Sequence, residues 1–230
     1  MIISENIHCW VFNNVPLFSD LSVDHKMDMH AALKEQKFHK NELIVKEGTL
    51  MNHLYIVRTG RVRICKQEEG KESIKHILQP GDVFGEFGII APETYIQFTN
   101  SVRAMDNDTI VYAFPYEVME RICKEDRKAI HKLVLNAMFK YKQLDQRLGS
   151  VVLKKSRDRI IDFIKELAHE IGKPIGYEML IKHNLTHQEI ADITGISRQK
   201  VTTILNELKQ EGLIHLERNS ILIHEMNLLD

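Results

Sequence analysis

The sequence predicts an α+β protein in which an antiparallel β-domain, a long helix and a small helical domain follow one another. Strand-like segments with regular turn signals continue to about residue 114, and a helical stretch without proline runs from there to about residue 155. A helix-turn-helix pattern then fills residues 185–208. At 230 residues the chain is long enough for more than one core. We expect a β-barrel sensing domain, a dimerisation helix with its hinge, and a winged helix-turn-helix domain, at residues 1–125, 126–155 and 156–230.

The β-domain is predicted from short segments between about Phe38 and Phe114. Residues 61–66 alternate polar and apolar side chains, and the polar residues 67–71 that follow are typical of a hairpin loop. In Gln79-Pro-Gly-Asp82, proline presets its own φ and glycine tolerates a positive φ, so a turn is expected. Many short strands separated by such turns predict an antiparallel sandwich or barrel.

From Tyr116 to about Lys155 the sequence predicts a long helix with a narrow apolar stripe. The stripe has the alternating spacing of a coiled-coil seam, and polar residues flank it on both sides. A parallel pairing with a second copy is the favoured interpretation, and packing of the helix against its own barrel is the alternative. The expected seam residues are Ile130, Val134, Ala137, Tyr141, Leu144, Leu148 and Val151.

Past the long helix, Ser156 is expected to cap a helix that ends near residues 172–174. Further on, Thr186 and Glu189 have the spacing of a capping box, which predicts the start of another helix. Gly195 suits a tight turn, and Ser197 is placed to cap the next helix. These signals together predict two short helices joined at Gly195.

The second of these helices is expected to have one apolar and one polar face. Its apolar residues repeat at helical spacing, and its opposite face is polar with no acidic residue as far as Asn206. Arginine and glutamine can pair with base edges in a DNA major groove, where an acidic residue would be repelled by phosphates. An ordinary helical hairpin with a solvated polar face is the alternative. Residues 215–224 have the pattern of a β-hairpin, which favours a winged helix-turn-helix. The apolar residues are Val201, Ile204, Leu205 and Leu208, and the polar ones are Arg198, Gln199, Thr202, Thr203 and Asn206.

Composition excludes several other classes of protein. The formal net charge is −1, which argues against indiscriminate coating of nucleic acid. No apolar run approaches the roughly 20 residues that cross a bilayer, and the N-terminus lacks a secretion signal, so we expect a cytoplasmic protein without a membrane partner. The three cysteines, Cys9, Cys65 and Cys123, are far apart and are expected to be reduced. An iron–sulfur cluster with its usual four cysteine ligands is not expected, and no metal-ligand pattern is present.

Several motifs follow one another in a fixed order along the chain. They are Asn14-Val-Pro-Leu-Phe18, the strand pair around Gly60, Pro80-Gly-Asp82, Gly85-Glu-Phe-Gly88 and Ile196-Ser-Arg-Gln-Lys-Val201. With these motifs the chain resembles the catabolite activator protein/FNR (CRP/FNR) family of bacterial transcription regulators over essentially its whole length. The resemblance implies a double-stranded β-helix barrel of the cupin-like, cyclic-nucleotide-binding type, a dimer helix, and a winged helix-turn-helix that binds palindromic promoter DNA.

The same resemblance implies DNA contacts at individual positions. Arg198, Gln199 and Thr203 stand where the family has its base-reading residues. Members similar to catabolite activator protein have glutamate and arginine at the positions of Gln199 and Thr203, so the half-site sequence is not carried over. Phosphate contacts are expected from Thr186, Gln188 and Ser197, and also from the cation Lys200.

The resemblance also implies an effector pocket, which departs from the cyclic AMP pattern. Gly85 and Glu86 match the residues that hold phosphate and ribose in members that bind cyclic AMP. Phe98 and Thr99 stand where those members have an arginine and a serine, so the phosphate lacks its charged partner. At two hydroxyl positions of the dimer helix the chain has Leu144 and Asp145, and the aspartate would repel a phosphate. We do not expect cyclic nucleotide binding.

Other inputs and other functions stay open at this point. A haem, another small molecule or a redox or gas signal would each fit a family sensor, and no ligand at all would also fit. RNA polymerase is a candidate partner beside promoter DNA and a second copy of the chain. A cyclic-nucleotide module that regulates a partner protein, and a cupin-like metalloenzyme, are the alternatives to a transcription regulator. The sequence does not indicate whether the regulator activates or represses.

Overall fold

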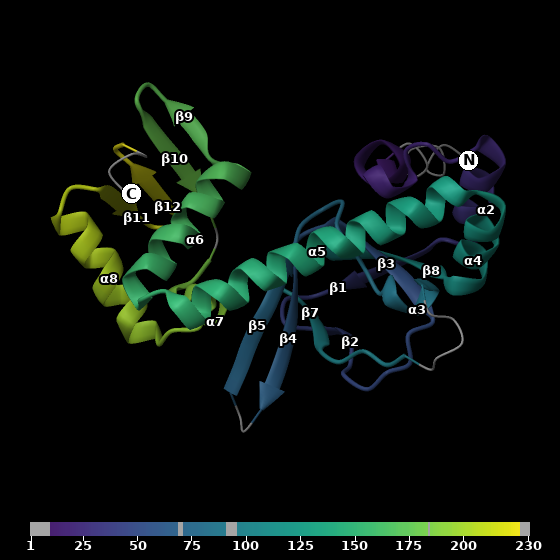
Figure 1. Cartoon of the computed structure of the whole chain (residues 1–230), viewed down its shortest axis with the longest axis horizontal. Helices are drawn as coiled ribbons and strands as arrows, with labels where there is room; N and C mark the ends of the chain where they lie inside the picture. The colour runs from purple at the N-terminus through teal and green to yellow at the C-terminus, as the bar shows by residue number, and fades with distance from the viewer. Residues whose placement is uncertain (1–9, 69–70, 91–95, 184, 226–230) are drawn as a thin grey trace. The chain divides into compact units, whose positions relative to one another are not determined.

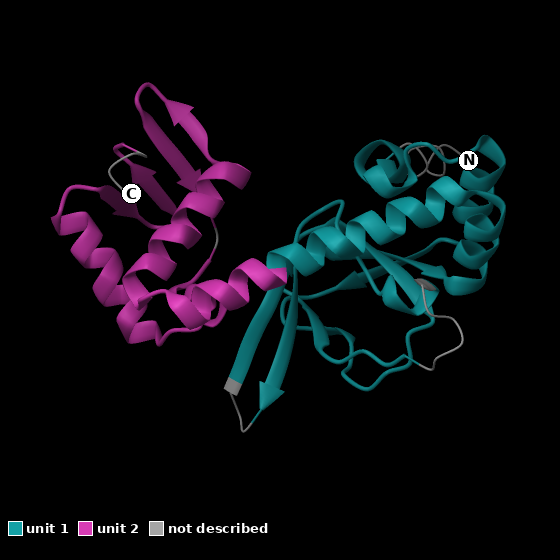
Figure 2. Ribbon diagram, in the orientation of Figure 1, with its two compact units in different colours: residues 1–143 teal, residues 144–230 magenta. Residues whose placement is uncertain are grey.

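The computed structural model describes residues 10–68, 71–90, 96–183 and 185–225. By its internal contacts the chain divides into two compact units, residues 1–143 and 144–230 (Figure 2). The boundary falls inside the long helix α5, Arg127–Leu153, whose last turns therefore belong to the second unit (Figure 1). The three-part division expected from the sequence stays a prediction.

Among its described residues, the first unit contains two four-stranded antiparallel sheets (Figure 1). One has the order β1-β8-β3-β6 and the other β2-β7-β4-β5. Large apolar side chains from both sheets meet in one cluster, which includes Val57, Val62, Val102 and Val111. This cluster is the interior of the predicted barrel. The strands are β1 (Lys34–Phe38), β2 (Leu43–Val45), β3 (His53–Thr59), β4 (Val62–Glu68), β5 (Lys71–Leu78), β6 (Val83–Phe84), β7 (Ser101–Ala104) and β8 (Thr109–Pro115).

Helices cover one sheet of the barrel from outside. Leu54 and Phe114, on β3 and β8, pack with Met29, Met119 and Leu133 in a second buried cluster. Strand β3 is thus buried on both faces, because its neighbouring residues alternate between the barrel interior and the helices. The covering elements are residues 10–14, η1 (Pro16–Phe18), α2 (Val23–Ala32), α4 (Tyr116–Glu125) and the first turns of α5, and the short α3 (Phe87–Ile90) follows β6.

The predicted single helix from Tyr116 to Lys155 is wrong in one respect, because it is broken at Asp126. Asp126 has extended backbone angles, and its Oδ1 accepts a hydrogen bond of 2.8 Å from the Lys128 amide. An aspartate that bonds its own following backbone competes with helical geometry and starts the next helix instead.

The described part of the second unit contains the end of α5, three further helices and one sheet. Its elements are α6 (Ser156–Ile171), β9 (Lys173–Ile175), β10 (Glu178–Lys182), α7 (His187–Thr194), α8 (Arg198–Gln210), β11 (Ile214–Glu217) and β12 (Ser220–Ile223). The sheet has the order β11-β12-β10-β9, so the predicted wing pairs with a second hairpin that the sequence analysis missed. Ser156 is the first residue of α6 rather than its cap, because Lys155 occupies the N-cap position.

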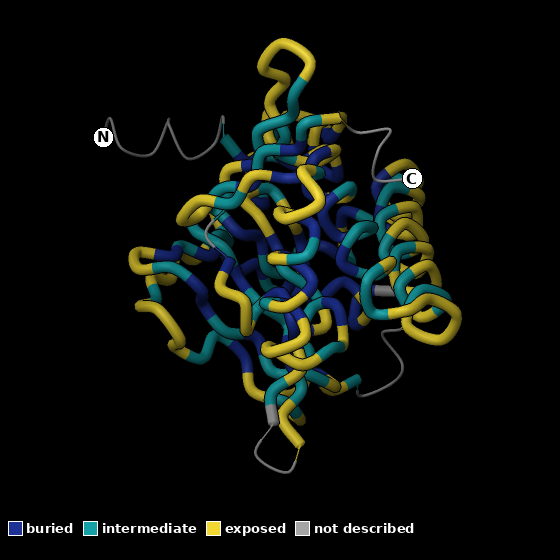
Figure 3. Tube along the Cα trace, turned by 90° about the vertical axis from the view of Figure 1, so that its left-hand side faces the viewer, coloured by how far each residue is buried: buried dark blue, intermediate teal, exposed yellow. Residues whose placement is uncertain are grey.

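Burial along the chain follows these elements. In Figure 3 buried segments alternate with exposed turns along the trace.

The turn between β3 and β4 needs glycine at position 60. The φ of Gly60 is +73°, and a Cβ there would lie 2.6 Å from Thr109 Oγ1. The neighbouring Arg61 joins this turn to the turn between β7 and β8. Its backbone N, Nε and Nη2 donate to the Asp106 carboxylate at 3.0, 2.9 and 2.7 Å.

The Asp106 bonds lead to a prediction about stability and pH. Hydrogen bonds from Arg61 hold the pKa of Asp106 below its ordinary value of 3.8. A carboxyl whose pKa is lowered by folding stabilises the protein above its unfolded pKa, and this contribution is lost as the pH falls through the folded pKa. We expect Asp106→Asn to lower the free energy of unfolding by about 1–2 kcal/mol at pH 7. Urea unfolding at several pH values should show the difference shrinking below about pH 4. A difference that stays constant in acid would contradict this account.

Candidate functional sites

The helix-turn-helix in the second unit is built as its local signals predict. The Thr186 hydroxyl accepts from the Glu189 amide at 3.2 Å, and the Glu189 carboxylate accepts from the Thr186 amide at 2.7 Å, so the capping box is formed. Gly195 ends α7 with a φ of +68°, which glycine adopts without the steric cost of a side chain. The Ser197 hydroxyl accepts from the Lys200 amide and caps α8. Thr186 and Ser197 thus cap the starts of the two helices, and Gly195 shapes the turn between them.

Helix α8 has the two faces that its sequence predicts. Val201, Ile204, Leu205 and Leu208 are buried against the rest of the unit. The three expected base-reading residues are all exposed on the opposite side, in the first two turns: Arg198, Gln199 and Thr203. The side chain of Thr203 donates to the Gln199 backbone carbonyl at 3.1 Å, so its methyl group and lone pairs are left to face outward.

The expected phosphate-contacting residues lie at the starts of α7 and α8. Thr186 and Ser197 are the N-caps of the two helices, and Lys200 is exposed one turn into α8. Backbone amides gather at such helix starts, and the helix dipole favours an anion there. Gln188 donates from Nε2 to the Asp192 carboxylate at 2.9 Å, so it would reach a phosphate only after leaving that partner.

A contact that the sequence analysis missed joins the two helices. His187, at the start of α7, lies with Nδ1 2.9 Å from the Thr202 hydroxyl of α8. The Thr202 hydroxyl also donates to the Arg198 carbonyl, at 3.1 Å. Thr202 therefore helps to hold the helices together, although the sequence placed it among the polar residues of the groove-facing side. No local pattern reveals this, because the two residues belong to different helices.

In the first unit, the expected effector residues Gly85 and Glu86 lie between β6 and α3. Gly85 has a φ of +89°, and a Cβ there would lie 2.7 Å from the His53 carbonyl. Glu86 is only 1% exposed, which makes it one of the few buried charged residues among those described. Burying a carboxylate is costly unless a cation or hydrogen-bond donors meet it.

The partner of Glu86 is Lys140 of helix α5. Lys140 Nζ lies 2.5 Å from Glu86 Oε1, and it also donates to the Val83 carbonyl. Lys140 is one of the polar residues that flank the predicted seam. In the structure it continues the buried stripe of Ala129 and Leu133, which faces the chain's own barrel. Lys140 of the same chain therefore supplies the cation that neutralises the buried Glu86.

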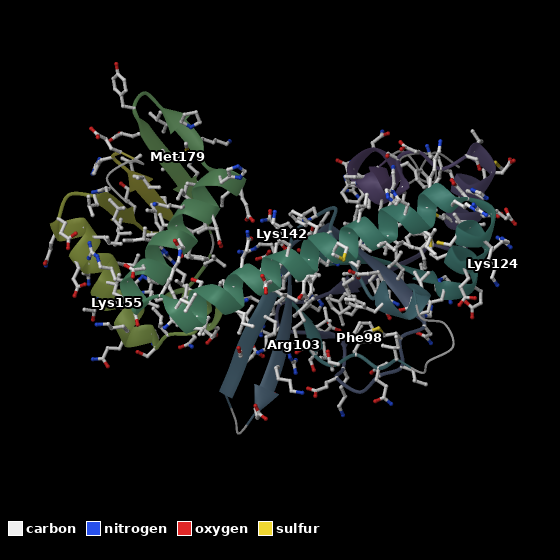
Figure 4. All side chains as sticks on the ribbon, viewed as in Figure 1. Phe98, Arg103, Lys124, Lys142, Lys155 and Met179 are labelled. Carbon is white, nitrogen blue, oxygen red and sulfur yellow. The ribbon has the colours of Figure 1, made fainter. Side chains whose placement is uncertain are left out.

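Aromatic side chains fill the space beside Gly85. Tyr55 stacks on Phe84 at a centroid distance of 4.8 Å, and Phe98 meets Tyr55 edge-on at 6.3 Å. Phe98 is buried in the barrel cluster (Figure 4), and its Cζ lies 3.5 Å from where a Gly85 Cβ would be. The Tyr116 hydroxyl donates to the Gly85 carbonyl, and burial raises the pKa of Tyr116.

The remaining expected pocket residues, Thr99, Leu144 and Asp145, are all exposed. Thr99 is exposed, and its backbone carbonyl is 3.5 Å from Lys66 Nζ. Leu144 and Asp145 are exposed and belong to the second unit. Of the residues predicted for the pocket, the structure brings together Gly85, Glu86 and Phe98.

Helix α5 exposes the predicted seam. Tyr141 and Leu148 are 64% and 63% exposed, and the other large apolar seam residues, Ile130, Val134, Leu144 and Val151, are exposed as well. The small Ala137 is partly buried. Such a contiguous apolar stripe on a surface is typical of a protein interface.

Two thiols can be assessed directly. Cys65 and Cys123 are free, and burial raises the pKa of each to about 11. Cys9 lies outside the described residues.

Within the described residues, no group of three or more histidine, cysteine or acidic side chains is arranged to hold a metal ion. The described helices include none long and apolar enough to span a membrane.

Comparisons with known families match both units. The cyclic nucleotide-binding domain family matches residues 35–126, and the Crp-like helix-turn-helix domain family matches residues 158–230. The first match covers the barrel with its Gly85-Glu86 turn, and the second covers α6 to the end of the chain.

Individual relatives agree with these matches. The chain is 29% identical to a CRP-like cAMP-activated global transcriptional regulator of Mycobacterium tuberculosis, over 85% of this chain and 88% of that protein. It is 22% identical to the global nitrogen regulator of Nostoc sp. PCC 7120, over 83% and 85%. A solved structure of a CooA variant from Carboxydothermus hydrogenoformans has the same fold, with a TM-score of 0.76 at 23% identity, covering 91% of this chain and 89% of that one. With a barrel of the cyclic-nucleotide-binding type followed by a Crp-like helix-turn-helix, the chain belongs to the CRP/FNR family of transcription regulators.

Proposed function

We propose that this DNA-binding transcription regulator acts as a cytoplasmic homodimer that places one α8 helix in each half of a palindromic promoter site. The observation that carries the proposal is the division of α8 into a buried apolar face and an exposed face with Arg198, Gln199 and Thr203. Arginine can pair bidentately with guanine, and glutamine with adenine, in the major groove. Two such helices about 34–36 Å apart would match successive major grooves on one side of the duplex.

Phosphate contacts would hold the protein in register without selecting the sequence. The starts of α7 and α8, capped by Thr186 and Ser197, offer backbone amides to the DNA backbone. Lys200 adds a cation on the same side, and Gln188 is the fourth proposed contact. RNA polymerase bound at the same promoter is the proposed downstream partner.

The dimer would form along the exposed seam of α5. The other stripe of this helix is already occupied by the barrel sheet through Ala129 and Leu133, so the seam is available to a partner. A parallel pairing of two α5 helices buries Tyr141 and Leu148 and relates the two protomers by a two-fold axis, as a palindromic site requires.

For the barrel we propose a signal other than cyclic AMP. The ribose-binding glutamate of the family, Glu86, is already paired with Lys140, and Phe98 brings an aromatic ring where a phosphate would need an arginine. Activation by cyclic AMP is the second candidate, favoured by Gly85-Glu86 and by the name of the Mycobacterium tuberculosis relative. Mass analysis and an absorption spectrum of the protein from its own host would identify a bound nucleotide, a haem or another small molecule.

Arg198 and Lys200 form a matched pair for testing DNA recognition. Arg198→Ala should remove about 1–3 kcal/mol of discrimination at one guanine of each half-site. Lys200→Ala should weaken specific and random duplexes alike, and lower the slope of log affinity against log salt by about 1. Fluorescence anisotropy on a selected site, its single-base variants and a random duplex measures both effects. Equal losses for Arg198→Ala on all duplexes would remove it from the base-reading residues.

Leu148 is the test of the dimer seam. Leu148→Asp places a charge in the proposed helix pair and should produce a monomer in light scattering at micromolar protein. Gln146→Asp adds the same charge on the exposed side of α5 away from the seam, and should leave the dimer intact. A dimer that survives Leu148→Asp would show that the seam has another use.

Substitution of Lys140 tests whether this lysine neutralises the buried Glu86 of the barrel. Lys140→Met leaves the buried Glu86 without its cation and should lower the free energy of unfolding by about 3–5 kcal/mol. The double variant Lys140→Met/Glu86→Gln should recover most of this lost stability. Lys142→Met, at an exposed lysine of the same helix, should change the free energy of unfolding little.

The choice of signal is tested on the unaltered protein. Cyclic AMP should leave its affinity for the selected duplex unchanged, and a tenfold gain in affinity would favour the second candidate.

A further inference from the structure

The end of α7 and the turn after it present a row of backbone carbonyls to neighbouring helices. A helix leaves its last carbonyls without partners inside the helix. At the end of α7, the Ala191 carbonyl accepts from the backbone amides of Gly195 and Ile196. The next four carbonyls belong to the last three residues of α7 and to its C-cap Gly195, and arginines outside α7 donate to them.

Two arginines from two other helices meet these carbonyls. Arg147, in the last turns of α5, donates from Nη2 to Asp192 O at 3.3 Å and to Ile193 O. Arg159 of α6 donates from Nη1 to Thr194 O at 3.0 Å and to Gly195 O at 3.3 Å. All of these residues lie within the second unit. We call the two arginines the turn clamp.

Helix α5 also approaches the turn with an apolar side chain. A Cβ on Gly195 would lie 3.4 Å from Arg159 Nη1 and 3.8 Å from Val151 Cγ2. Val151 is therefore a neighbour of the turn, one helical turn beyond Arg147 on α5. The end of α5 thus contacts the turn through both a polar and an apolar side chain.

Electrostatics favour cations at this place. The carbonyl end of a helix carries a partial negative charge, and a cation there is stabilising. Burial lowers the pKa of the Arg147 guanidinium, and it also raises the pKa of the neighbouring Glu166. Electrostatic attraction between Glu166 and Arg147 opposes both of these pKa shifts, so the carboxylate as well as the carbonyls favours the cation.

We infer that Arg147 is a positioning residue for DNA reading, through which helix α5 sets the orientation of the turn and of helix α8. Arg147 lies between Leu144 and Leu148, two residues of the proposed seam. Pairing of α5 with a second copy would therefore fix the same two turns that hold the helix-turn-helix. The inference rests on the proposed function, since it requires that α8 enters DNA and that α5 forms the dimer.

The test compares three variants of the full chain. Arg147→Met removes the donors, and Arg147→Lys keeps the charge but loses the planar fork that reaches two carbonyls. Arg121→Met is the control, because Arg121 is a half-exposed arginine of α4 in the first unit and pairs there with Asp28 at 2.8 Å. The measurements are affinity for a selected duplex and a random duplex, oligomeric state, thermal midpoint, and amide hydrogen exchange of residues 190–200.

We expect Arg147→Met to lose about tenfold or more in affinity for the selected duplex, with little change on the random duplex and an unchanged dimer. Hydrogen exchange should accelerate at residues 190–200. Arg147→Lys should recover part of the loss, and Arg121→Met should behave as the unaltered protein in its duplex affinities, its oligomeric state and the exchange of residues 190–200.

Two outcomes would overturn the inference. One is unchanged exchange at residues 190–200 in both Arg147 variants, and the other is an equal loss on selected and random duplexes. Failure of the proposed function looks different, because the unaltered protein would then prefer no duplex over random DNA. The exchange measurement needs no DNA and tests the clamp in either case. Should Arg147→Met not fold, the same comparison is made with Arg147→Lys.

Discussion

Helix α5 cannot bury both of its apolar stripes within one chain, and the organisation of the protein follows from this constraint. One stripe, with Ala129 and Leu133, closes the outer face of the barrel sheet. The second stripe, with Tyr141 and Leu148, stays exposed in the described chain. Since exposed apolar surface of this extent favours association, α5 links the packing of the sensor to the proposed pairing of two protomers. The same helix ends at the turn that holds α8.

Polar residues of α5 take part in both units. Lys140 extends the buried stripe and neutralises Glu86 in the first unit, and Arg147 meets the carbonyls of the turn in the second. Each contact satisfies groups that would otherwise be costly to bury. Helix α5 therefore contributes Lys140 to the proposed sensing site in the barrel and Arg147 to the turn that precedes α8. In the barrel, Lys140 pairs with Glu86, the carboxylate that the family resemblance assigns to a ribose, and this pairing supports the proposal of another signal.

Much of the helix-turn-helix could be predicted because its signals are local. The capping box of Thr186 and Glu189, the left-handed Gly195 and the cap at Ser197 each depend on neighbours a few residues away. The barrel and the wing also followed from short-range alternation and turns. The break at Asp126 was missed because a single aspartate interrupts an otherwise regular pattern. The roles of Lys140, Arg147 and Thr202 were missed because their partners lie far away in the sequence, where spacing carries no information.

The raised pKa values of Cys65 and Cys123 have a consequence for the speed of oxidation. With a pKa of about 11, each thiol is a thiolate about once in 10⁴ molecules at pH 7. Peroxides and disulfides react with the thiolate, so both sulfurs would respond slowly on the time scale of gene regulation. Burial of Cys65 and partial burial of Cys123 thus disfavour the use of either thiol as a fast redox switch.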